Sequence, residues 1–207
     1  MIMSGKRIMS AIAILSVTFM AGGVAMSAYA GFQIYSSKVE QGRSYLPAAQ
    51  EIWKEKIPGS IRQSAAIPTG DFLGTIYIPA ISKTVNIFQG TNAKELSRGA
   101  GHYLGSVLPG VKDNSVIAGH RDTVFSSLGK VKLGAKIVIT TEDGVFTYRV
   151  NRIRIVYASD RTVIVPTELA TLTLSTCYPF NFIGAAPKRY IVVAKISKSK
   201  PSSITSI

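Results

Sequence analysis

Beyond residue 71 the chain consists of short segments in which apolar and polar residues alternate, and this pattern restricts the fold most strongly. Alternation with a period of two is typical of strands that bury one face. Eight such segments are predicted as strands: 72–78, 84–88, 115–118, 136–141, 145–157, 162–165, 171–176 and 190–196. Short helical turns are expected near 93–98 and 168–170. We expect a mainly β fold that closes into a barrel, because closure removes unpaired edges; the pattern alone leaves a two-sheet sandwich open.

A second feature is a long uncharged segment at residues 8–35, which follows Lys6 and Arg7. About 20 apolar residues cross a bilayer as a helix, and basic flanking residues stay in the cytoplasm. We therefore expect a cytoplasmic N-terminus at 1–7, a transmembrane anchor at 8–35, and the rest of the chain outside the plasma membrane. A cleaved signal peptide is the alternative, since Ala28-Tyr29-Ala30 resembles a cleavage site, but the apolar run exceeds the roughly 7–15 residues of a signal peptide.

Residues 36–70 separate this segment from the strands. They are polar with scattered apolar side chains, and Pro58, Gly59, Pro68 and Gly70 punctuate their second half. Proline and glycine in such clusters mark linkers. We expect a stalk or linker at 36–70 and one β-barrel domain at 71–207.

The chain is strongly basic, with a formal charge of +13 from 24 Lys and Arg residues against 11 Asp and Glu residues. A basic protein is attracted to polyanions such as nucleic acid, an anionic membrane or a cell-wall polymer. The basic residues are spread along the chain and accompany no nucleic-acid-binding motif. We therefore expect no nucleic-acid partner and a basic surface next to an anionic envelope.

Cys177 is the only cysteine of the chain, so no intramolecular disulfide can form. A free thiol outside the cell is a liability unless it has a use. Cys177 ends a predicted strand and Pro179 follows it, so the thiol faces a loop. A nucleophile in that position is held rigidly and is still reachable by substrate.

His120 and Arg189 also stand at predicted strand ends. A thiol needs a base or a cation to act as a nucleophile, and a guanidinium can stabilise an oxyanion. Each residue alone is better explained as a surface or core side chain without a role. Together they form a Cys-His-Arg hypothesis.

Other chemistries are poorly supplied. Two histidines and one cysteine without clustered carboxylates do not make a dedicated metal site. The sequence has no phosphate-binding loop and no dinucleotide fingerprint. We expect no metal and no cofactor.

Three segments resemble the sortase family. Residues 173–177 read Thr-Leu-Ser-Thr-Cys, similar to the sortase pattern Thr-Leu-x-Thr-Cys, and residues 119–125 read Gly-His-Arg-Asp-Thr-Val-Phe, similar to the segment around the sortase histidine. Arg189 follows Cys177 by a dozen residues, where sortases carry their arginine. Cys-Tyr-Pro-Phe at 177–180 and Pro-Lys-Arg-Tyr at 187–190 most resemble class D. The resemblance covers roughly 72–196.

The resemblance implies an eight-stranded sortase barrel and a cysteine transpeptidase. Such an enzyme cleaves a C-terminal sorting signal of the Leu-Pro-x-Thr-Gly kind at the Thr carbonyl and forms a thioacyl enzyme. An amine of a cell-wall peptide or a lipid-linked precursor then accepts the secreted surface protein. By the same resemblance Cys177 is the nucleophile, His120 the acid and base, and Arg189 the clamp for the carbonyl or oxyanion. Thr176 would touch the substrate backbone, and His102 would be structural or peripheral.

Two departures from other sortases narrow the function. The sequence shows neither an N-terminal lid motif nor a second membrane span, so we expect anchoring of single proteins rather than pilin polymerisation. Two alternatives stay open at this point. One is a cysteine peptidase outside the cell that hydrolyses the same signal, and the other is a non-enzymatic module that binds a wall polymer.

Overall fold

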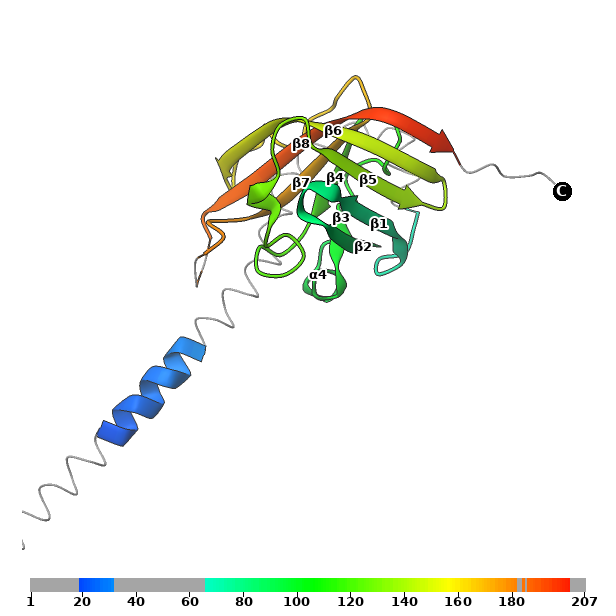
Figure 1. The fold of residues 1–207 in the computed structure, drawn as a ribbon. Helices are drawn as coiled ribbons and strands as arrows, with labels where there is room; N and C mark the ends of the chain where they lie inside the picture. The colour runs from blue at the N-terminus through cyan, green and yellow to red at the C-terminus, as the bar shows by residue number, and fades with distance from the viewer. Residues whose placement is uncertain (1–18, 32–65, 182–183, 185, 202–207) are drawn as a thin grey trace, which may run out of the picture. The chain divides into compact units, whose positions relative to one another are not determined.

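The computed structural model describes residues 19–31, 66–181, 184 and 186–201 (Figure 1). In the described part, eight strands close into a barrel in the order β1-β2-β3-β4-β7-β8-β6-β5. The strands are β1 Phe72–Ile78, β2 Lys83–Gln89, β3 Ala100–His102, β4 Asn114–Ala118, β5 Lys136–Thr141, β6 Gly144–Tyr157, β7 Thr171–Tyr178 and β8 Lys188–Pro201. The short helix α4 Ala93–Arg98 and the 3-10 turns η1 Pro79–Ile81 and η2 Leu128–Lys130 lie between strands. The predicted closed barrel is confirmed, and the sandwich is wrong.

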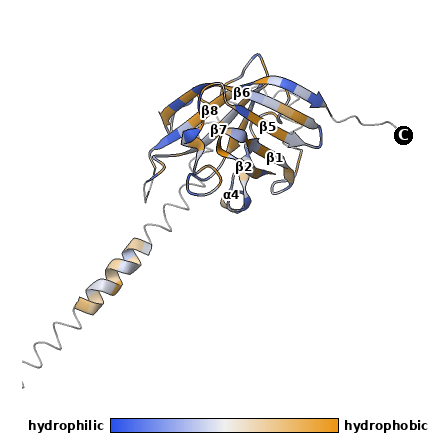
Figure 2. Ribbon diagram, in the orientation of Figure 1, coloured by the Kyte–Doolittle hydropathy of each residue, from blue (hydrophilic) through white to orange (hydrophobic). Residues whose placement is uncertain are grey.

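Alternating side chains fill the barrel. Hydropathy changes from residue to residue along the strands (Figure 2), and the inward positions are apolar. On β5, Ile137 and Ile139 are fully buried, and on β7 Leu172 and Leu174 are fully buried in the same core cluster. Fully burying one such side chain is worth about 1.5–3 kcal/mol. The period of two in the sequence therefore fixes which side chains face outward.

Two pairings in the barrel are parallel: β2 with β3, and β4 with β7. The remaining neighbours run antiparallel, including the long ladder between β6 and β8 and the hairpin of β5 and β6. Parallel strands end at the same edge of a sheet and need a crossover connection. The chain therefore brings residues near 118 and 175 together, although more than 50 residues separate them.

Three local predictions differ from the structure. Strand β3 was not predicted, because three residues are too short to show a period. Residues 162–165, predicted as a strand, form turns and bends, and 168–170 contain no helical turn. Asn114 explains why residues 162–165 do not form a strand. Its side-chain Nδ2 donates to the carbonyls of Val163 and Val165, both at 3.3 Å, so a side chain takes the place of a neighbouring strand.

Residues 19–31 are helical, yet no helix in the described part of the chain has both the length and the apolar content that crossing a bilayer requires. Residues 8–18 and 32–35 of the predicted anchor lie outside the described residues, as do residues 36–65 of the predicted stalk. The anchor and the stalk therefore remain predictions.

His102 forms a buried polar network at the barrel end of β3. Its side chain is fully buried, with Nδ1 2.8 Å from Oε1 of Gln89. Nε2 lies 2.9 Å from the carbonyl oxygen of Val107 and 3.2 Å from the hydroxyl of Ser106. Burial lowers the pKa of His102 from 6.5 to about 4, and the bond to Val107 opposes this only in part. This agrees with a structural role.

The lowered pKa makes a prediction about stability and pH. Between pH 6.5 and pH 4 the unfolded chain binds a proton at His102 that the folded chain does not, so the free energy of unfolding falls as the pH falls through this window. The full effect is about 3 kcal/mol. Thermal unfolding of wild type and His102→Gln at pH 7 and pH 5 measures it. We expect the variant to be less stable at pH 7 and to lose less stability on acidification; equal losses would contradict the prediction.

Candidate active site

The parallel pairing of β4 with β7 sets the position of His120. Ala118 opposes Ser175 in the ladder, and the backbone N–H of Gly119 donates to the carbonyl of Ser175 at 3.1 Å. The hydroxyl of Thr176 donates to the carbonyl of Gly119 at 2.7 Å. The two segments therefore stay in register beyond the end of β4, and His120 is level with Cys177.

The antiparallel pairing of β7 with β8 sets the position of Arg189. Cys177 opposes Arg189 directly in this ladder. Because β7 lies between β4 and β8, Cys177 is the central residue of the row His120–Cys177–Arg189. Neighbouring strands lie about 4.8 Å apart, so all three residues lie within the reach of their side chains.

The three side chains also share a face. Leu174 on β7 and Tyr190 on β8 belong to the barrel core. Because side chains alternate along a strand, Cys177, three residues after Leu174, and Arg189, directly before Tyr190, face outward. Ile117 on β4 is also a core residue, which places His120, three positions later, on the outer face. The structure thus brings the predicted residues together on the outside of the barrel, at the end where β4 and β7 terminate.

This outer site is largely shielded from solvent. Cys177 is 2% exposed and Arg189 is 6% exposed, while His120 is half-buried. Thiolate is the reactive form of cysteine, and neighbouring cations stabilise it. Electrostatic interactions gain strength where water is excluded. His120 and Arg189 stand on either side of Cys177 in the row, and both kinds of side chain can carry the positive charge that stabilises a thiolate.

Arg189 is oriented by the chain segment that leads into β8. Its Nη1 donates to the carbonyl of Ala186 at 2.8 Å and to that of Lys188 at 3.0 Å. A guanidinium has five N–H donors in a planar fork, and these two bonds fix the plane of the fork.

Thr176 has a different orientation from the one expected. Its side chain is fully buried, and its hydroxyl is bonded to Gly119. It therefore lies on the opposite side of β7 from Cys177 and fastens the β4 end that carries His120. The contact of Thr176 with a substrate backbone therefore stays a prediction, and its side chain has a structural partner instead.

Arg121 belongs to the surroundings of the site and was not predicted. It follows His120, is 5% exposed, and donates from Nη1 to the carbonyl of Pro179 at 3.0 Å and from Nη2 to that of Gly184 at 2.9 Å. Both acceptors lie in the connection between β7 and β8. A buried guanidinium must be hydrogen-bonded to be tolerated, and this one joins the histidine segment to the segment after the cysteine. An arginine directly after the candidate histidine was the only signal in the sequence.

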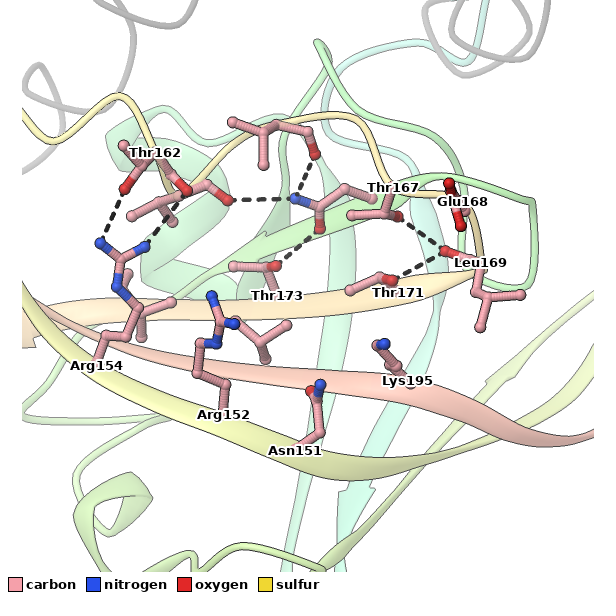
Figure 3. A pocket seen from close by; sticks show the side chains of 15 residues that line it. Asn151, Arg152, Arg154, Thr162, Thr167, Glu168, Leu169, Thr171, Thr173 and Lys195 are labelled. Atoms are coloured by element: carbon pink, nitrogen blue, oxygen red, sulfur yellow. Dashed lines mark hydrogen bonds between the residues drawn. The ribbon is translucent and has the colours of Figure 1, made fainter.

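A pocket of about 340 Å³ lies on the same outer face. Its floor includes Thr173 on β7 and Ile191 and Val193 on β8, and the segment between β6 and β7 closes it from the other side (Figure 3). Asn114 holds that segment in place through Val163 and Val165, and its Oδ1 accepts from the hydroxyl of Thr173 at 2.7 Å. The pocket is therefore partly apolar and includes Thr171 and Thr173 of β7, the strand that ends next to Cys177, whereas none of His120, Cys177 and Arg189 lines it.

Comparisons with known proteins agree with this arrangement. The sortase domain family matches residues 76–197. The chain is 31% identical over 192 residues to sortase D of Bacillus subtilis strain 168, covering 88% of this chain and 97% of the relative.

Two solved structures share the fold and more than a quarter of the aligned residues. Sortase E of Streptomyces avermitilis has a TM-score of 0.58 and 27% identity, covering 68% of this chain and 97% of that one. Sortase A of Listeria monocytogenes has a TM-score of 0.58 and 28% identity, covering 64% and 92%. The expected resemblance is confirmed, including its similarity to a sortase D: the chain belongs to the sortase family of cysteine transpeptidases.

Proposed function

We propose that the chain cleaves a C-terminal sorting signal of the Leu-Pro-x-Thr-Gly kind and transfers the protein that carries it to an amine of the cell wall. One observation supports this most directly: Ala118 opposes Ser175 and Cys177 opposes Arg189, so His120, two residues after Ala118, extends a row with Cys177 and Arg189. The three residues supply a base, a nucleophile and an oxyanion donor, which together suffice for acyl transfer.

The first half-reaction uses the row in order. The Cys177 thiolate attacks the Thr carbonyl carbon, and the carbonyl oxygen becomes an oxyanion that accepts a hydrogen bond from Arg189. The carbon–nitrogen bond then breaks, and the protonated imidazole of His120 gives its proton to the leaving amine. The products are a thioacyl enzyme and the released C-terminal peptide.

The second half-reaction reverses these roles. An incoming amine attacks the thioacyl carbon, and His120 accepts the proton that the amine loses. The carbon–sulfur bond breaks, and the thiolate of Cys177 is restored. Water in place of the amine would give the free acid, so the product distinguishes transfer from hydrolysis.

The pocket is the proposed site for the part of the signal that precedes the cleaved bond. That part stays attached to Cys177 in the thioacyl enzyme, whereas the other side must stay open for the amine. The apolar floor around Ile191 and Val193 suits the Leu and Pro side chains of the signal.

The proposed partners follow from the family and from the N-terminal segment. Secreted surface proteins with a sorting signal would be the substrates, and a cell-wall peptide or lipid-linked precursor would supply the amine. Residues 8–35 would anchor the enzyme in the plasma membrane with the barrel outside, next to both partners.

Substitutions in the row test the mechanism. Cys177→Ala should abolish turnover, because no thioacyl enzyme can form. His120→Ala should lower kcat by about 10²–10⁴-fold while the thiol can still be alkylated. Arg189→Lys keeps the charge but loses the planar fork, so kcat should fall by about 10²–10³-fold. The measurement is turnover of a Leu-Pro-x-Thr-Gly peptide with and without an added amine, followed by mass spectrometry.

The matched control is His102→Gln, which alters the other histidine and should keep turnover near that of wild type wherever it is folded. Amine-ligated product supports transpeptidation, and free acid alone would assign the chain to the peptidase alternative. Wild-type turnover in His120→Ala would show that the histidine assignment is wrong.

Arg121 should act through the connection between β7 and β8. Arg121→Met removes both carbonyl contacts, each worth about 1.5–3 kcal/mol for a charged donor, and we expect kcat/KM to fall at least tenfold. Arg121→Lys should restore part of it. The control is Arg98→Met, which also removes an arginine–carbonyl bond, to Gly70 at 2.8 Å, on the distant helix α4. Equal losses in the two methionine variants would mean a general effect on stability.

The anchor is tested in cells. We expect the protein to fractionate with membranes and its barrel to be digested by protease added from outside, because residues 8–35 carry no charge. A soluble mature protein that begins at Gly31 would establish the signal peptide instead.

A further inference from the structure

The outer faces of three adjacent strands are basic. Strands β5, β6 and β8 together carry nine Lys and Arg residues and no Asp or Glu, and six of the nine are exposed: Lys136, Arg149, Arg152, Lys195, Lys198 and Lys200. The adjacent order β8-β6-β5 in the barrel makes this one continuous surface. At the C-terminal end of β8, hydrophilic residues dominate (Figure 2).

Within this surface, like charges oppose one another directly. Lys136 on β5 opposes Arg149 on β6, and Arg149 opposes Lys195 on β8. All three side chains are exposed, and Arg149 also donates to the carbonyl of Gly134 at 3.1 Å. Like charges in directly opposed cross-strand positions destabilise a sheet. This basic row of Lys136, Arg149 and Lys195 is therefore a cost to the fold that an anionic partner would remove.

The basic row continues into the pocket. Lys195 belongs to the row and also lines the pocket. A β-bulge in β6 adds Arg152: the register shifts between Val150 and Arg152, so that Arg152 opposes Val193 on the outer face instead of pointing into the core. Figure 3 shows both side chains at the floor of the pocket, Arg152 from β6 and Lys195 from β8.

The pocket lining contains two further charged groups, Arg154 and Glu168. Arg154 is already paired with Asp160 at 3.1 Å. Glu168, on the opposite wall, is exposed. Two basic side chains thus mark one end of the groove, which we call the basic end: Arg152 and Lys195.

The distance of the basic end from Cys177 indicates which part of a substrate lies there. Lys195 opposes Thr171, six residues before Cys177 on β7, which corresponds to about 20 Å. An extended substrate advances by a similar length per residue. With the Thr carbonyl at Cys177, the residues next to Arg152 and Lys195 are the one to three residues that precede Leu of the signal.

We propose that the basic end and the basic row bind an acidic peptide segment immediately N-terminal to the sorting signal of the substrate. The enzyme then selects among proteins with the same pentapeptide by the charge of the residues before it. This rests on the proposed function, because it takes the pocket as the site of the signal. An acidic segment is favoured over an anionic polymer because the basic residues continue the peptide groove itself.

Binding and turnover together test this proposal on the full chain. Three labelled peptides share one Leu-Pro-x-Thr-Gly signal, preceded by Asp-Glu-Asp, Ser-Ser-Ser or Lys-Lys-Lys. Fluorescence anisotropy measures their affinity for the Cys177→Ala protein, which cannot cleave them, and kcat/KM is measured on the wild type. We expect the acidic peptide to bind about three- to tenfold more tightly than the serine peptide at low salt, the value of two surface ion pairs, and the difference to vanish at high salt. The gain should appear in KM rather than kcat.

Charge reversal supplies the decisive comparison. Arg152→Glu with Lys195→Glu should reverse the preference toward the lysine peptide. The control Lys94→Glu makes the same kind of change at an exposed position on α4 and should leave the preference unchanged. Equal affinities for the acidic and serine peptides, or an equal shift in the control, would overturn the proposal. A third result would also overturn the proposal: polyphosphate binds the wild type but not the charge-reversed variant, and the wild type shows no difference in affinity among the three peptides. If no peptide is turned over but the acidic one still binds best, the proposed reaction fails and this inference stands.

Discussion

The parallel pairing of β4 with β7 is the interaction on which the site depends. Only parallel strands bring two carboxyl-terminal ends to the same sheet edge, and here those ends carry His120 and Cys177. The bond from the Thr176 hydroxyl to the Gly119 carbonyl extends the pairing past the last ladder residue. If that register slipped by one residue, His120 would turn to the opposite face, because side chains alternate along a strand. The backbone register therefore determines which side chains can meet at the site.

The site also has a cost for stability. Cys177 and Arg189 are almost buried, and Arg121 next to them is buried as well. Burying a guanidinium is unfavourable unless its N–H groups are bonded. Both arginines satisfy that condition with backbone carbonyls of the connection between β7 and β8, from opposite ends of it. The same bonds that make the charges tolerable thus fasten Pro179, Gly184 and Ala186 to the arginines beside Cys177.

How far the sequence predicts this structure depends on whether a feature is local. The barrel and the positions of Cys177, His120 and Arg189 could be predicted, because strand periodicity and strand ends are visible in short windows. Strand β3 could not, because three residues show no period. Residues 162–165 have a strand-like composition, but Asn114, about 50 residues away, takes up their carbonyls. Arg121 was missed for the same reason, since its acceptors at Pro179 and Gly184 are distant in sequence.

One geometric rule governs both the candidate site and the pocket on the outer face of the barrel. On β7 and β8, alternate residues face outward. The outward residues that precede Cys177 on β7 and follow Arg189 on β8 therefore line the pocket, among them Thr173, Ile191 and Val193. On β6 the same alternation would turn Arg152 inward, and the bulge after Val150 corrects it. Bulges next to functional sites commonly re-aim a side chain in this way. An irregularity that interrupts the ladder and exposes a charge is hard to explain by stability, whereas the proposed role of Arg152 at the pocket accounts for both the bulge and the residue that follows it.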